Sequence, residues 1–103
     1  MKTLSLSVLD RCKLTELLPL NGGKVEMLLV QSIMKKAEFS LEDIAEFGMK
    51  DTVNGVAWTN GKDVDFEFTL EQIEVLKAAS KRADEEKKIT RENLPLIEKI
   101  DML

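Results

Sequence analysis

The sequence predicts a small α+β domain, in which four or five helices pack on a β-hairpin or a short antiparallel sheet. Apolar residues recur at helical spacing in several segments that begin with Ser or Thr capping signatures. Between residues 49 and 68 the apolar period changes to two, as in a half-buried strand. The 103 residues, 44% hydrophobic and 33% charged, fit one domain with one modest core.

The chain begins with a predicted strand and a helix. Residues 3–8 alternate apolar and small polar side chains, which predicts a half-buried strand. Ser7, with Asp10 three residues later, marks a helix start, because the hydroxyl caps free amides and the carboxylate faces the positive end of the helix dipole. We expect this helix over residues 8–18, with these residues toward the core: Leu14, Leu17 and Leu18.

The second helix, predicted over residues 24–38, has more apolar positions than one face needs. Four residues at helical spacing are expected in the core: Val25, Leu28, Leu29 and Ile33. Three others spread onto different faces: Met27, Val30 and Met34. Such a wide apolar arc indicates a central helix or one with a protein partner.

A short third helix is predicted over residues 41–47. Ser40 and Asp43 form a capping signature, and Phe39 precedes it as a hydrophobic staple. Gly48 ends the helix. Three residues are expected to be buried: Leu41, Ile44 and Phe47.

Alternation in residues 49–68 predicts a hairpin around Asn60-Gly61. A two-residue loop would place apolar residues opposite acidic ones, so an odd-length loop is preferred. That register pairs Trp58 with Val64 and Val56 with Phe66. Asn54-Gly55 is a second turn signal, which would fold residues 49–53 back as an additional strand.

Two further helices complete the chain. Thr69 and Gln72 form a capping box that opens a helix over residues 70–87, whose charged end, residues 81–88, should project into solvent. Its inward positions are Ile73, Leu76, Ala79 or Ser80, and Ala83. Thr90 or Asn93 caps a last helix that runs through these apolar residues: Leu94, Ile97 and Ile100.

The side chains that the sequence lacks restrict its chemistry. It has no His and no Tyr, which excludes Ser-His-Asp and Cys-His sites, and Cys12 is the single cysteine, so no internal disulfide can form. We expect neither a cofactor nor a metal. Asp63, Asp65 and Glu67 lack the spacing of a calcium loop and are expected on the solvated face of a strand, although a small enzyme or metal site built from carboxylates is an alternative.

Charge and hydropathy restrict the classes of partner that the sequence predicts. Ten acidic and two basic residues fall within residues 38–74, and clustered cations that would follow a nucleic-acid backbone are missing. We therefore expect no direct nucleic-acid contact and, for the acidic middle, a basic protein partner. No apolar run suits a signal peptide or a bilayer span, so we expect no membrane contact and a cytoplasmic location.

The order of the motifs resembles a group of small proteins that bacteriophages and prophages encode. The pieces that carry the resemblance are Leu6-Ser-Val-Leu-Asp-Arg11, Leu17-Leu-Pro19 with a Gly loop, Phe39-Ser-Leu-Glu-Asp-Ile44, Phe66-Glu-Phe68 and Lys87-Lys-Ile-Thr90. The carboxyl end departs from the Leu-Tyr-x-Lys-Phe pattern of the group, because it reads Leu96-Ile-Glu-Lys-Ile100. The resemblance implies a phage-derived protein inside a bacterium and supplies no activity.

The function predicted from the sequence is a non-catalytic protein-interaction module, with a protein partner or a second copy of the chain. An alternative is an acidic inhibitor that imitates nucleic acid and occupies a basic host protein. The residues predicted to contact a partner are Met27, Val30, Met34, Glu42, Glu46 and Asp65.

Overall fold

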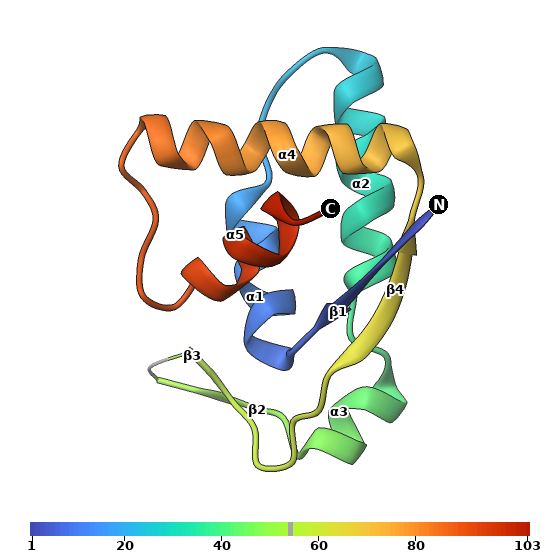
Figure 1. The fold of residues 1–103 in the computed structure, drawn as a ribbon. Coiled ribbons are helices and arrows are strands. Elements are labelled where there is room, and N and C mark those ends of the chain that lie inside the picture. The colour runs from blue at the N-terminus through green and yellow to red at the C-terminus, as the bar shows by residue number, and fades with distance from the viewer. Residues whose placement is uncertain (54) are drawn as a thin grey trace.

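The computed structural model describes residues 1–53 and 55–103, and within them five helices and two small antiparallel sheets form an α+β domain, as the sequence predicts (Figure 1). The elements in chain order are β1 (Lys2–Leu6), α1 (Val8–Leu17), α2 (Lys24–Ala37), α3 (Leu41–Phe47), β2 (Lys50–Thr52), β3 (Gly55–Ala57), β4 (Val64–Phe68), α4 (Leu70–Glu85) and α5 (Leu94–Asp101).

Three of the helices begin at the capping residues that the sequence predicts. Ser7, Ser40 and Thr69 each accept a hydrogen bond from the backbone N–H three residues later, and the side chain at that position accepts one from the cap's own N–H. Each box satisfies two backbone donors that the first helical turn leaves free. The predicted starts of α1, α3 and α4 are confirmed.

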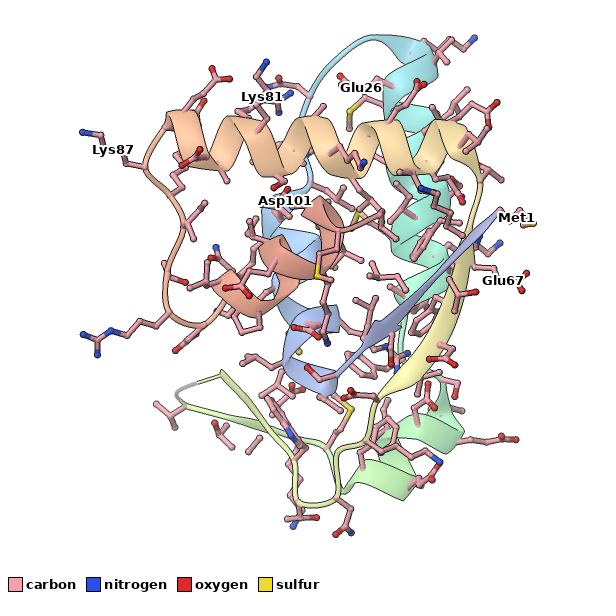
Figure 2. All side chains as sticks on the ribbon, in the orientation of Figure 1. Met1, Glu26, Glu67, Lys81, Lys87 and Asp101 are labelled. Atoms are coloured by element: carbon pink, nitrogen blue, oxygen red, sulfur yellow. The ribbon has the colours of Figure 1, made fainter. Side chains whose placement is uncertain are left out.

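The charged end of α4 projects from the domain, as predicted. The helix ends at Glu85, two residues before the predicted boundary, and the Lys81 and Lys87 side chains point away from the other helices (Figure 2). Asn93 is the N-cap of α5, and the Thr90 hydroxyl oxygen accepts a bond from the Asn93 N–H over 3.2 Å. Both predicted caps therefore take part in this turn.

The strand pairing differs from the predicted hairpin. β4 pairs antiparallel with β1, with Leu4 opposite Phe66 and Leu6 opposite Val64. The predicted pairs of Trp58 with Val64 and Val56 with Phe66 are wrong, because β4 pairs with the strand at the start of the chain.

The additional strand predicted around residues 49–53 is present as β2. It pairs with β3, and Val56 lies opposite Asp51. Asn54 of the predicted Asn54-Gly55 turn lies outside the described residues. The hairpin therefore forms one turn earlier in the chain than the Asn60-Gly61 signal suggests.

Trp58 packs beside the start of α1. The indole is half-buried, and a Cβ atom added to Gly61 would lie 2.9 Å from its Cδ1 atom and 3.2 Å from a methyl carbon of Val8. Only a residue without a side chain lets the loop approach the ring so closely. Trp58 is thus sheltered by its own loop and by Val8.

The core lies where α1, α2, α4 and α5 meet one face of the β1–β4 sheet (Figure 1). Leu4 and Leu6 point into it from β1 and Phe68 from β4, while Asp65 and Glu67 lie on the opposite, exposed face, as alternation requires. The predicted inward positions of α4 are buried: Ile73, Leu76, Ala79, Ser80 and Ala83.

Several predicted core positions are exposed. In α3 only Phe47 is buried, whereas Leu41 and Ile44 keep 86% and 40% of their surface. This helix lies with β2 and β3 at one end of the molecule, where it has few neighbours to cover a second face (Figure 1). The prediction that α3 buries all three residues is therefore wrong for Leu41 and Ile44.

Candidate functional site

An apolar groove runs between α1 and α2 and has a volume of ≈ 1010 Å³. Helix α1 contributes Cys12 and Thr15 to one wall, and β3 contributes Val56 at one end. The other lining residues are Arg11, Glu16, Met27, Val30, Gln31, Met34, Lys35, Ala37, Glu38 and Phe39. A groove of this size and apolar character suits part of a protein segment or a small ligand.

The groove brings together the three apolar residues that the sequence assigns to a partner. Met27 is half-buried in one wall and Met34 is 40% exposed at the rim. Val30 is only 2% exposed and belongs to the hydrophobic core. The prediction that Val30 lies on an outer face of the helix is therefore wrong, while Met27 and Met34 are accessible.

The outer face of α2 also carries apolar residues. Val25 and Leu28 are 72% and 57% exposed, so the prediction that they face the core is wrong. Of the residues predicted to face inward, Ile33 is buried and Leu29 is partly buried. The inward face of α2 is set by α1, α4 and β4, all of which pack against it.

Arg11 closes one end of the groove and joins three helices. Its Nε donates to the Ala37 carbonyl over 3.1 Å, and its Nη2 donates to the Glu38 carbonyl over 2.9 Å and to Asp43 Oδ2 over 3.2 Å. The first two bonds satisfy carbonyls at the end of α2, where the helix dipole favours a cation. The guanidinium lies 4.0 Å from the centre of the Phe39 ring.

Arg11 is only 3% exposed. The sequence pattern did not indicate that it is buried or that it joins three helices. In the sequence it appears only as one of the residues that carry the phage resemblance. An Arg in the first turn of a helix usually projects into water, since Arg is almost never fully buried unless paired. Its partners lie 26 to 32 residues away, so no local spacing marks the cluster.

The acidic residues predicted to contact a partner do not gather in one place. Glu46 forms an ion pair with Lys62 over 2.7 Å, and Glu42 is exposed on α3. Asp65 lies on the outer face of the β1–β4 sheet, opposite Ser5. The acidic middle is thus divided between α3 and the sheet.

Two ionisable groups near the groove, Asp43 and Cys12, have shifted pKa values. The hydrogen bond from the Ser40 N–H, and then the bonds from Arg11, hold the pKa of Asp43 below its ordinary value of 3.8. Burial, followed by the nearby Glu16 carboxylate, raises the pKa of Cys12 above 9.0. Within residues 1–53 and 55–103, His, Cys, Asp and Glu side chains do not form a group of three or more that could hold a metal ion.

The raised pKa of Cys12 predicts that its thiol reacts slowly, which can be tested. At neutral pH the thiol stays protonated, and the thiolate is the nucleophile, so iodoacetamide should alkylate Cys12 more slowly than it alkylates cysteine in an unstructured peptide. Unfolding in urea should abolish the difference. Mass spectrometry of timed samples measures both rates, and a native rate equal to that of the peptide would contradict the protected position of Cys12 in the groove.

Comparisons with protein-family models, with curated proteins and with solved structures give no significant match to this chain. The resemblance to phage proteins therefore stays a prediction. In the described part of the chain, no helix has both the length and the apolar character that a bilayer span requires.

Proposed function

We propose that this protein is a non-catalytic interaction module that binds a second copy of itself through α2. The observation that carries the proposal is the apolar outer face of this helix, beside the groove. Leu28 is 57% and Met34 is 40% exposed, and Met34 lines the groove together with Met27. Exposed apolar side chains beside an apolar groove on a small domain are typical of an interaction site.

The order of residues along α2 suits a two-fold contact between antiparallel helices. In such a contact each residue meets one that is equally far from the axis on the other helix. With the axis at Gln31, Leu28 lies opposite Met34 of the second copy, and the same pair repeats on the other side. Leu28 and Met34 of both copies are then covered.

The charges of the helix fit the same arrangement. Lys24 and Glu38 lie seven residues before and after Gln31, and both are exposed. Antiparallel packing places Lys24 of each copy beside Glu38 of the other, whereas parallel packing would place Lys24 beside Lys24. Ion pairs at a rim contribute only about 0.2–1 kcal/mol each, so they select the orientation while apolar burial supplies most of the affinity.

Charge reversal tests the proposal. Lys24→Glu and Glu38→Lys should each weaken the dimer, because each creates two like-charge contacts across the axis. The double variant should restore the dimer, because the pairs re-form with opposite sign. Sedimentation velocity over a range of protein concentrations measures the association.

The controls are matched in chemistry. Lys81→Glu removes a cation from the exposed end of α4, and it should leave the sedimentation coefficient unchanged. Leu28→Glu should yield a folded monomer, whereas Leu70→Glu, a change at another exposed leucine, should not alter association. A wild-type chain that stays monomeric at the highest concentration it tolerates, or a double variant that fails to restore the dimer, would refute the proposal.

A further inference from the structure

The β1–β4 sheet has an open edge at β1. Its only paired neighbour among the described residues is β4. On the far side of β4, Lys36 Nζ donates to the Glu67 carbonyl, so that carbonyl points away from β1. Residues directly opposite in an antiparallel pair exchange both backbone hydrogen bonds or neither.

This alternation fixes the direction of the free backbone groups on β1. Thr3 lies opposite Glu67 and Ser5 lies opposite Asp65. Their N–H and C=O groups therefore point away from β4, and no backbone hydrogen bond joins them to another segment of the described chain. The outer edge of β1 thus presents two donors and two acceptors in a row, the arrangement that an added strand requires.

The solvated face next to this edge is acidic. Asp65 and Glu67 point out from β4, and Glu67 points away from the helices (Figure 2). Neither carboxylate forms an ion pair with a described residue. Thr3 and Ser5, which lie opposite Glu67 and Asp65, stand between these carboxylates and the open edge, and both have short side chains.

We propose that β1 binds an extended segment of a basic protein as a third strand of this sheet, a surface separate from the dimer contact on α2. Lys or Arg at alternate positions of the segment would lie beside Thr3 and Ser5. Strands are about 4.8 Å apart, so the cationic group crosses about 10 Å to reach Asp65 or Glu67, a distance that a long side chain and a carboxylate together can span.

The charge pattern favours this occupant over a second copy of the chain. Two β1 strands that pair with each other would place Thr3 and Ser5 beside Thr3 and Ser5 on the solvated face. That arrangement brings no cation to Asp65 or Glu67. A basic strand supplies both the backbone hydrogen bonds and the missing charges, since strand addition draws affinity from the backbone and specificity from alternate side chains.

A synthetic seven-residue peptide that alternates Lys and Val tests the proposal with the full-length protein. Titration followed by NMR should slow hydrogen exchange at the Thr3 and Ser5 amides, while the amides of α2 keep their rates. Added salt should weaken binding, because it screens exposed charges. A peptide of the same length that alternates Glu and Val should not bind, and methylation of alternate backbone nitrogens in the Lys peptide should abolish protection.

Variants of the protein distinguish the contribution of backbone hydrogen bonds to peptide binding from the contribution of the charges. Asp65→Lys combined with Glu67→Lys should weaken the Lys peptide about tenfold or more. Ser5→Pro removes an outward N–H without removing a bond to β4, so the folded variant should lose peptide protection at Thr3. If Ser5→Pro does not fold, the methylated peptide tests the same requirement for backbone hydrogen bonds.

Three results would overturn the proposal. The Lys peptide could bind without protecting Thr3 and Ser5, or the Glu peptide could bind equally well. The two amides could instead become protected without any peptide as protein concentration rises, which would make a second copy the occupant. Failure of the dimer at α2 leaves this test unaffected, because its readout is confined to β1.

Discussion

Arg11→Met should lower the free energy of unfolding by about 3–5 kcal/mol, because it leaves two carbonyls without their donor and Asp43 without its cation. Arg11 is 3% exposed, so water cannot simply replace the guanidinium. Urea unfolding followed by circular dichroism measures the change. Arg11→Lys should recover only part of it, since an ammonium cannot reach three acceptors with the geometry of a planar guanidinium.

The matched control is Lys13→Met, two residues along the same helix. Lys13 pairs with Glu16 and Glu92, whose side chains are 69% and 65% exposed. Because water screens such surface pairs, Lys13→Met should lower the free energy of unfolding much less than Arg11→Met does. An Arg11→Met variant that loses no more stability than Lys13→Met would contradict the role of Arg11 in joining α1, α2 and α3.

The same cluster predicts a pH dependence. The folded protein holds the pKa of Asp43 below 3.8, first through the Ser40 N–H and then through Arg11. A depressed pKa contributes stability above the unfolded pKa, and that contribution is lost as pH falls through the folded pKa. Asp43→Asn should therefore reduce the loss of stability below about pH 4. An acid unfolding curve unchanged by Asp43→Asn would show that other carboxylates govern it.

Val30→Glu should leave the chain largely unfolded. Val30 is 2% exposed within the core, and an unpaired carboxylate there costs several kcal/mol, roughly, out of the total of about 5–15 kcal/mol that stabilises a small domain. Met34→Glu, four residues later and 40% exposed, should change stability by no more than about 0.5–1 kcal/mol while it weakens the dimer.

Circular dichroism and sedimentation velocity on the two variants distinguish stability from association. Val30→Ala, which adds no charge, should fold with a smaller loss of stability than Val30→Glu. A Val30→Glu chain that folds as the wild type does would mean that the inward face of α2 has been assigned wrongly.

The sequence alone determines where three of the helices, α1, α3 and α4, begin. The capping boxes at Ser7, Ser40 and Thr69 involve atoms only three residues apart, so their bonds form whenever the first turn does. The inward face of α4 is predictable too, because its apolar residues occupy a single stripe. Both features depend on contacts within one helix or on one unambiguous pattern.

The candidate site is only partly predictable. The surplus of apolar residues on α2 indicates an interaction surface, and Met27 and Met34 do line the groove. The helix carries two apolar arcs, however, and α1, α4 and β4 decide which of them is covered. That choice buries Val30 and exposes Val25 and Leu28, the reverse of what spacing suggests.

The pairing of β4 was decided only by the tertiary structure. Alternation shows that Val64, Phe66 and Phe68 share a face, but it does not identify the strand beside them. A nearby partner such as Val56 costs less chain entropy to reach, whereas β1 lies far back along the chain, at its start. The pairing with β1 is favoured because Leu4 and Leu6 are then buried together with Phe68 in the core that α1, α2, α4 and α5 share.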